Sequence, residues 1–239
     1  MPNTYDLTGR SAIVTGAARG VGRAIAELLL ASGCSVTAWD ANSCDLPGAA
    51  SARVDITDAA QVAAALARYS SERLDILINN AGYLGPVTEF SAHVSGDWHR
   101  IIEVNLRGTM QVTQSVLPIM VRQGGGRIIN LGSLAGKEGV AGITAYSAAS
   151  GGIISFTKAL GREMAQHNVF VNCVAPGPLD TEMIRNLGAD VVARMVSDSP
   201  LGRLGSASEV AHLVAWLCSD ASRFNAGAVF DMSGGRARY

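Results

Sequence analysis

Short runs of apolar and β-branched residues alternate along the chain with longer segments in which apolar residues recur at helical spacing. The runs predict seven strands, at residues 11–15, 34–39, 52–54, 74–78, 127–131, 169–174 and 229–231. The longer segments predict helices at residues 20–31, 57–69, 96–122, 146–166 and 208–218. Strands that alternate with helices are typical of an α/β fold, so we expect a Rossmann-type doubly wound parallel sheet with helices on both faces.

Glycine and proline mark the ends of several predicted elements. Gly33 ends the first helix, and Pro118 is expected to bend the last turns of the helix at 96–122. Residues 179–205 are rich in glycine and proline, which predicts a mobile substrate loop. The chain contains no repeat, low-complexity segment or linker, so residues 1–239 are predicted to form one dinucleotide-binding and catalytic domain.

Composition and charge exclude several classes of function. Hydrophobic residues make up 48% of the chain, charged residues 16%, and the formal net charge is -1. These values are typical of a globular protein and provide no basic surface for nucleic acid. No apolar run approaches the roughly 18 residues that would span a bilayer, and the first residues do not resemble a signal peptide. We expect a cytoplasmic protein that binds neither membrane nor nucleic acid.

The histidine and cysteine residues do not form a metal-binding pattern. The histidines are scattered, and no two cysteines form a C-x-x-C pair. We therefore predict no metal site and no disulfide, with reduced thiols that are mostly buried. The cysteines are Cys34, Cys44, Cys173 and Cys218.

A glycine-rich turn joins the first predicted strand to the first predicted helix. Glycine allows a tight turn, a close approach of the backbone to a pyrophosphate and close packing of helix against strand. The amino end of the helix then presents free N–H groups and a partial positive charge. The sequence therefore predicts a dinucleotide site made by Thr15, Gly16, Arg19, Gly20, Val21 and Gly22.

Asp40, at the end of the second predicted strand, indicates which dinucleotide is bound. A carboxylate at this position accepts hydrogen bonds from the adenosine ribose hydroxyls and repels a 2′-phosphate. The next residue, Ala41, supplies no compensating cation, and Arg19 would share its space with Asp40. These features favour NAD over NADP.

The glycine-rich turn, the Asn79-Asn80-Ala81-Gly82 segment and the downstream Tyr146 resemble the short-chain dehydrogenase/reductase family over essentially the whole chain. The resemblance implies a seven-stranded parallel sheet and a homotetramer or dimer built through two long helices. It also implies that Asn79 braces the sheet. The further cofactor contacts that it implies are Asp55 and Ile56 at the adenine, Ala81 and Gly82 along the cofactor, and Pro176, Gly177, Leu179 and Thr181 at the nicotinamide carboxamide.

The resemblance also implies a catalytic group of Asn, Ser, Tyr and Lys. Asn105, Ser133 and Tyr146 match the first three, but Ser150 stands where the Tyr-x-x-x-Lys pattern expects lysine. Tyr146 would act as general base for alcohol oxidation, and would donate the proton in the reverse direction. A free tyrosine has a pKa of about 10, so only about one in a thousand is phenolate at pH 7. Lysine would favour the phenolate through its charge, which a serine hydroxyl cannot supply.

Three interpretations of Ser150 stay open. It is a deliberate replacement that disables the enzyme, a natural replacement compensated by another group or a water, or the mark of an NAD-binding protein without redox turnover. Lys137 either reaches into the pocket or is a solvated loop residue. Lys158 lies three helical turns from Tyr146, about 18 Å away, which is too far to substitute.

The sequence leaves the substrate open within the class of small-molecule alcohols and ketones. NAD use favours oxidation of a polyol, sugar or sugar acid; cyclic alcohols, hydroxysteroids and hydroxyacyl esters stay open. Arg236 or Arg238 either binds a substrate carboxylate or belongs to a solvated tail. Halohydrin dehalogenases also lack the lysine, but they lack the glycine-rich turn that this chain retains, so dehalogenation is not favoured.

Overall fold

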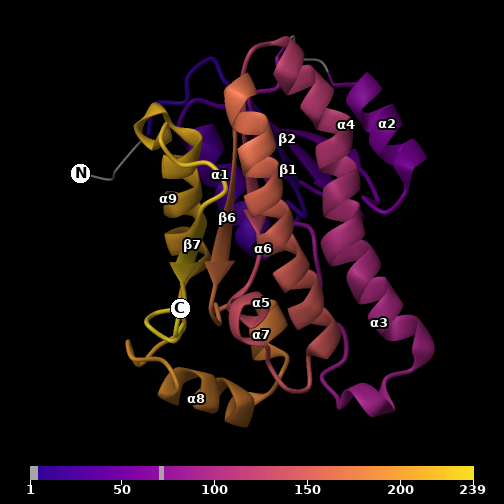
Figure 1. The fold of residues 1–239 in the computed structure, drawn as a ribbon, viewed down its shortest axis with the longest axis vertical. Helices are drawn as coiled ribbons and strands as arrows, with labels where there is room; N and C mark the ends of the chain where they lie inside the picture. Colours follow the sequence, from indigo (N-terminus) through magenta and orange to yellow (C-terminus); the bar gives the residue numbers. More distant parts are fainter. Residues whose placement is uncertain (1–4, 70–72) are drawn as a thin grey trace.

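Seven parallel strands form one twisted sheet in the computed structural model, which describes residues 5–69 and 73–239 (Figure 1). The strands are β1 (Ser11–Thr15), β2 (Ser35–Asp40), β3 (Ala50–Arg53), β4 (Ile76–Asn79), β5 (Gly126–Leu131), β6 (Val169–Pro176) and β7 (Val229–Met232). Their order in the sheet is β3-β2-β1-β4-β5-β6-β7, and every neighbouring pair is parallel. The predicted doubly wound α/β fold is confirmed. The strand order reverses between β1 and β4, and in open parallel sheets ligands bind at the carboxyl ends of the strands beside this point.

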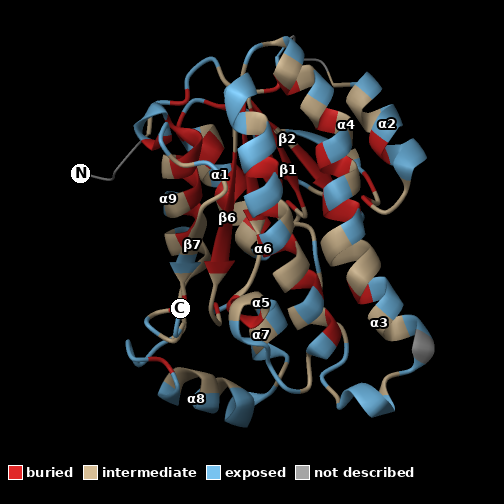
Figure 2. Cartoon of the chain, in the orientation of Figure 1, coloured by how far each residue is buried: buried red, intermediate tan, exposed pale blue. Residues whose placement is uncertain are grey.

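Helices cover both faces of the sheet. They are α1 (Gly20–Ala31), α2 (Ala59–Ala67), α3 (Ser95–Ile102), α4 (Thr109–Arg122), α5 (Leu134–Glu138), α6 (Thr144–Met164), α7 (Glu182–Arg185), α8 (Ala189–Ser197) and α9 (Ala207–Cys218). One core cluster joins α1 and α9 to the sheet, and a second joins α2, α4 and α6 to the opposite face. In β1, Ala12 and Val14 contribute to the first cluster and Ile13 to the second, as the alternation of side chains along a strand requires. Figure 2 shows the strands buried between these two layers.

The structure divides the helix predicted at 96–122 into α3 and α4. A π-helical segment, Glu103–Gly108, separates the two. The backbone is right-handed helical at Ile102 and Thr109 on both sides of this segment, so hydrophobic spacing predicts one continuous helix. Such segments occur frequently at functional sites, and this one contains Asn105.

The region predicted as a mobile loop at 179–205 contains α7 and α8. A parallel bridge between Leu179 and Gly205 closes its base. Both helices are short and contain no buried residue, and Gly188 and Pro200 flank α8, so the composition of the region predicts a loop. We call residues 179–205 the lid segment below. Figure 1 shows α7 and α8 at the end of the molecule toward which the arrows of β6 and β7 point.

None of the helices in the described ranges is long and apolar enough to cross a membrane.

The four cysteines are unpaired. Burial raises the pKa of the Cys34 and Cys173 thiols to about 12, so both stay protonated at neutral pH.

A buried polar network crosses the centre of the sheet. The Asn79 amide donates to Thr113 Oγ1 (2.9 Å) on α4 and to Asn130 Oδ1 (2.8 Å) on β5. Asn130 in turn donates to Thr157 Oγ1 (2.9 Å) on α6. Because buried polar groups are costly unless paired, these bonds fix the positions of α4 and α6 relative to the carboxyl ends of β4 and β5.

We predict that Asn130→Ala lowers the free energy of unfolding by about 2–3 kcal/mol, because it leaves donors and acceptors unpaired in the core. Urea denaturation measures this change. The exposed Asn186, replaced by alanine, is the control and should change stability by less than about 0.5 kcal/mol. Equal effects of the two substitutions would contradict a structural role for the network.

Candidate functional site

The turn between β1 and α1 packs against the loop that follows β4. Gly16 and Gly20 have φ of +65° and +58°, a conformation that favours glycine. A Cβ at Gly16 would lie 2.7 Å from Ala81 Cα, and one at Gly22 would overlap the Gly16 carbonyl. The turn therefore accepts only glycine at these positions, and it lies directly against the end of β4.

Thr15 and Asn80 hold this turn in place. The Thr15 hydroxyl accepts from the backbone N–H groups of Asn80 (3.0 Å) and Ala81 (3.1 Å). The Asn80 side chain donates to the carbonyls of Thr15 (3.1 Å) and Gly16 (3.0 Å). Asn80 belongs to the segment that carries the family resemblance, but it is not among the predicted cofactor or catalytic residues. Its position directly after a buried strand was the available signal.

The amino end of α1 has the features of an anion site. No side chain caps it and its first turn carries no acidic residue. The N–H groups of the first turn of a helix need partners from outside the helix, and together with the helix dipole they favour a phosphate. The predicted contacts of Gly20, Val21 and Gly22 with a pyrophosphate fit this geometry.

Asp40 lies beside the same turn. Its Oδ2 accepts from the Ala18 N–H (3.1 Å), and its Oδ1 accepts from the backbone N–H of Asn42 (2.9 Å). The carboxylate is therefore fixed at the end of β2, next to the turn, as the sequence predicted.

The Arg19 side chain forms an ion pair with the lid segment. Its guanidinium pairs with Glu182 of α7 (2.8 Å), and both side chains are largely exposed. The pair joins the glycine-rich turn to the lid segment at the surface.

Asp55 and Ile56, predicted to flank an adenine, lie beyond the end of β3. The Asp55 carboxylate accepts from the Thr57 N–H (2.9 Å) and pairs with Arg100 (3.3 Å). Ile56 is buried and lies against Gly108 at the end of the π-helical segment. Both residues are on the carboxyl side of the sheet, as the predicted role requires.

Asn105 links the π-helical segment to the loop after β4. Its amide nitrogen donates to the carbonyls of Ile101 (2.8 Å) and Tyr83 (3.0 Å), and its Oδ1 accepts from the Tyr83 N–H (3.2 Å). A side chain at Gly82 would overlap Oδ1 of Asn105. Asn105 therefore holds the predicted cofactor-lining residues Ala81 and Gly82 in position, which sequence spacing could not show.

Ser133, Tyr146 and Ser150 form a cluster of hydroxyl groups. Ser133 caps α5 by accepting from the Ala135 N–H (3.1 Å). A Cβ at Gly136 of α5 would lie 2.7 Å from Ser150 Cβ, so α5 and α6 are in close contact. The cluster thus depends on the packing of one short helix against one long one.

The environment of Tyr146 keeps its phenol neutral. Burial raises its pKa, while hydrogen bonds with the Ser133 and Ser150 hydroxyls lower it, and the net pKa lies above the ordinary 10.0. No cationic side chain of the described residues is among these causes. Ser150 thus supplies a hydrogen bond to Tyr146 without the charge of a lysine.

Lys137 neither enters this cluster nor is solvated. Its ammonium pairs with Asp231 of β7 (2.9 Å) and lies 5.7 Å from the centroid of the Tyr239 ring. The side chain is only 12% exposed. Asp231 is a second residue that we did not identify from the sequence, because nothing local indicates that β7 meets α5.

The C-terminal residues pack on the lid segment and on α5. Arg236 pairs with Asp198 at the end of α8 (3.6 Å), and the Arg238 N–H donates to Glu138 (2.9 Å). Arg236 is partly buried in this contact, whereas Arg238 and Tyr239 are exposed, so both alternatives from the sequence stay open. The Arg236 guanidinium faces a carboxylate of the same chain.

The residues predicted to hold the nicotinamide carboxamide follow β6. Pro176 ends the strand, and the Gly177 N–H donates to the Met232 carbonyl (3.1 Å). Leu179 forms the bridge at the base of the lid segment, and the Thr181 N–H donates to its carbonyl (2.8 Å). These residues therefore connect the sheet to the lid segment.

The described residues contain no group of three or more His, Cys, Asp or Glu side chains that could hold a metal ion. The groups at the carboxyl edge that could bind a ligand or transfer a proton are the amino end of α1, the Asp40 carboxylate and the three hydroxyl groups. This arrangement fits a dinucleotide and a proton-transferring phenol.

Comparison with known proteins supports the same assignment. The profile of the family described as "Enoyl-(Acyl carrier protein) reductase" matches residues 16–237. The chain is 39% identical over 244 residues to the 2-dehydro-3-deoxy-L-rhamnonate dehydrogenase (NAD(+)) of Sphingomonas sp. (strain SKA58), covering 97% of this chain and 96% of that protein. It is 39% identical to the 3-oxoacyl-(acyl-carrier-protein) reductase FabG of Escherichia coli (strain K12), covering 96% and 98%.

A solved structure shows the same fold. The aldohexose dehydrogenase of Thermoplasma acidophilum superposes with a TM-score of 0.92 at 28% identity, covering 99% of this chain and 97% of that one. The chain therefore belongs to the short-chain dehydrogenase/reductase family and is an oxidoreductase.

Proposed function

We propose that this protein interconverts a secondary alcohol and a ketone with NAD(H), on a polyol, sugar or sugar acid. The observation that carries the proposal is the hydrogen bond from the Ala18 N–H to Asp40 (3.1 Å), which fixes a carboxylate against the glycine-rich turn. At this position, a carboxylate binds the ribose hydroxyls of NAD and repels the 2′-phosphate of NADP.

The names of similar proteins support the substrate class. One relative is a dehydrogenase of the sugar acid 2-dehydro-3-deoxy-L-rhamnonate, and the superposed structure is an aldohexose dehydrogenase. The FabG relative acts on 3-oxoacyl groups, so hydroxyacyl esters belong in the substrate panel as the competing class.

The proposed reaction combines a hydride transfer by the cofactor with a proton transfer by residues at the carboxyl edge. The nicotinamide ring, when bound, accepts a hydride from the alcohol carbon or returns it to the ketone. The Ser133 hydroxyl holds the substrate oxygen, and Tyr146 removes the hydroxyl proton in oxidation or donates it in reduction. Residues 176–181 would hold the carboxamide, and the lid segment would cover the substrate.

We propose that Ser150 weakens the oxidative direction. Oxidation requires a phenolate, and the raised pKa of Tyr146 keeps that form scarce at neutral pH. The same observation favours a second candidate, an NAD-binding protein of this fold without redox turnover. Tight NADH binding without turnover on any panel substrate, even at pH 10, would select the second candidate.

We also propose that residues 1–239 act as one domain and assemble as a homotetramer or dimer through α4 and α6. Met110 of α4 is 42% exposed although it is apolar, which is consistent with a face covered by another subunit.

Replacing Asp40 with serine should reverse the nucleotide preference. The loss of charge-assisted hydrogen bonds to the ribose should weaken NADH binding by about 10- to 100-fold, because each such bond contributes about 1.5–3 kcal/mol. NADPH binding should strengthen, because the repulsion of its 2′-phosphate is removed. Titration of nucleotide fluorescence measures both, independently of turnover. An unchanged ratio of the two affinities would refute the role of Asp40.

Replacing Ser150 with lysine should raise alcohol oxidation at pH 7 by about tenfold or more, since general base catalysis typically contributes 10²- to 10⁴-fold. The ammonium would supply the missing positive charge beside Tyr146. Steady-state NAD reduction over the substrate panel measures the change, with Ser147→Lys on the same helix as the control. A rate unchanged by Ser150→Lys would show that another group already performs this role.

The pH profile of the unmodified enzyme should differ between the two directions. Because the pKa of Tyr146 is raised, the rate of oxidation should rise about tenfold per pH unit from pH 7 and reach no plateau below pH 10. Ketone reduction uses the neutral phenol, so its rate should stay nearly constant from pH 7 to 9. Initial rates in both directions test this. A plateau of oxidation below pH 9 would be inconsistent with an unassisted phenol.

A further inference from the structure

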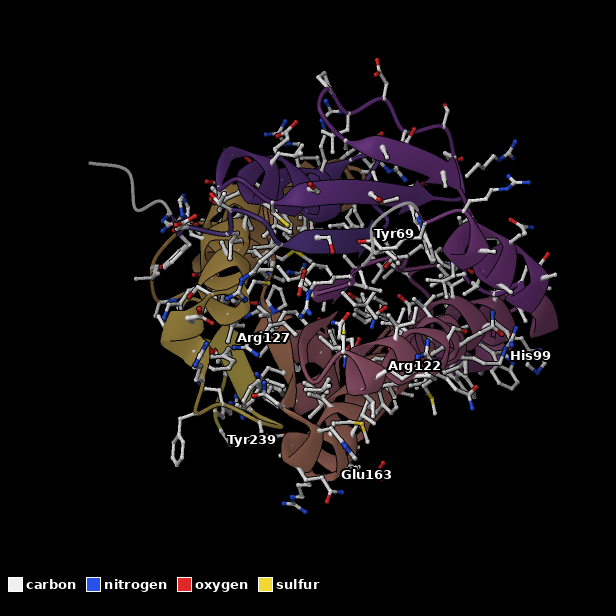
Figure 3. All side chains as sticks on the ribbon, turned by 90° about the horizontal axis from the view of Figure 1, so that it is seen from above. Tyr69, His99, Arg122, Arg127, Glu163 and Tyr239 are labelled. Atoms are coloured by element: carbon white, nitrogen blue, oxygen red, sulfur yellow. The ribbon has the colours of Figure 1, made fainter. Side chains whose placement is uncertain are left out.

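A polar cavity lies at the opposite end of the sheet from the glycine-rich turn. Its volume is about 230 Å³. It is lined by Arg10, which precedes β1, by Arg127 at the start of β5, and by Asp220 and Arg223 after α9. Figure 3 views the molecule from this end and labels Arg127 beside the yellow C-terminal elements. The proposed reaction uses none of these residues.

The cavity has an excess of positive charge. Asp220 is the partner of three guanidinium groups, those of Arg10 (2.7 Å), Arg223 (3.0 Å) and Arg127 (3.9 Å). Arg73 and Asp75 pair separately on its rim (3.2 Å). Among the described residues, the Asp220 cluster therefore carries three positive charges against one negative charge.

Arg127 is the least compensated member of the cluster. Its side chain is only 7% exposed and stacks 4.4 Å from the centroid of the Phe170 ring. Its Nε is buried with no hydrogen-bond acceptor among the described residues, and the carboxylate of Asp220 is at the limit of an ion pair. Burial and the neighbouring Arg10 and Arg223 lower its pKa, which reflects incomplete neutralisation.

We propose that this cavity binds a small dianion of the phosphate class. Two negative charges match the excess charge of the Asp220 cluster, and guanidinium groups bind tetrahedral oxyanions through paired N–H groups. A volume of about 230 Å³ has room for roughly seven groups of the size of a water molecule. A bound phosphate would satisfy the charge of Arg127 without displacing Asp220.

The ligand is inorganic phosphate or the phosphoryl group of a small metabolite, and the experiment distinguishes these sources. The unmodified full chain is titrated with inorganic phosphate, phenyl phosphate or phenol, none of which belongs to the proposed substrate class, at constant ionic strength set with sodium chloride. Thermal unfolding and calorimetry follow binding. Saturating NADH is present in a parallel series, so that phosphate binding at the glycine-rich turn is excluded.

We expect inorganic phosphate to raise Tm by about 3 °C or more at tenfold excess over Kd, with and without NADH. Tighter binding of phenyl phosphate, with no response to phenol, would identify an esterified phosphate as the source. Equal affinities would identify the free ion.

Two variants at the cavity should change the affinity in opposite directions. Arg223→Gln removes one positive charge and should weaken phosphate binding about tenfold, whereas Asp220→Asn removes the competing carboxylate and should tighten it. Arg122→Gln, at the end of α4 and also labelled in Figure 3, is the matched control and should leave Kd unchanged.

The proposal is overturned if phosphate raises Tm no more than the same ionic strength of chloride. It is also overturned if Arg223→Gln and Arg122→Gln respond alike, or if Asp220→Asn fails to tighten binding. None of these outcomes depends on the substrate or on turnover, so failure here is distinguishable from failure of the proposed oxidoreductase reaction.

Discussion

The site at the carboxyl edge of the sheet depends on one close contact, between the turn after β1 and the loop after β4. The absence of side chains at Gly16 and Gly22 lets the turn lie against Ala81 and the Asn80 amide. This contact places the amino end of α1 at the point where the strand order reverses. It also places the Asn80–Gly82 loop where Asn105 can hold it. The proposed nucleotide cradle, made of the glycine-rich turn, the amino end of α1 and Asp40, therefore rests on the same backbone that Asn105 holds.

Dinucleotide binding and proton transfer depend on different parts of the carboxyl edge of the sheet. The cradle relies on backbone groups and on the Asp40 carboxylate, and all of these are in place. Proton transfer depends on the electrostatic environment of Tyr146, where burial opposes ionisation and the two neighbouring hydroxyls only partly offset it. Because hydrogen bonds from neutral groups stabilise a phenolate less than a nearby ammonium does, a complete cradle does not ensure a rapid oxidation.

The lid segment is held mainly by groups at the surface. Arg19 pairs with Glu182 at its start and Arg236 pairs with Asp198 near its end, and three of these four side chains are more than half exposed. Exposed ion pairs contribute little to stability and are screened by salt. These pairs therefore hold α7 and α8 only weakly against the rest of the molecule. The backbone bridge between Leu179 and Gly205 closes the base of the segment independently of them. This arrangement is consistent with the role proposed for the lid segment, which is to cover the substrate.

The sequence by itself determined the order and type of the main strands and helices, the position of the cradle and the absence of lysine at residue 150. These features depend on local periodicity or on single residues, which can be recognised without knowing which segments meet. Tertiary structure decided the π-helical segment at Asn105, the two helices of the lid segment, the Asn80 contacts with the cradle and the pairing of Lys137 with Asp231. Asn80 lies 65 residues from Thr15, and Lys137 lies 94 residues from Asp231, so no local pattern indicates that they meet. Folding of the sheet brings them together, and their chemistry then follows from distance and burial.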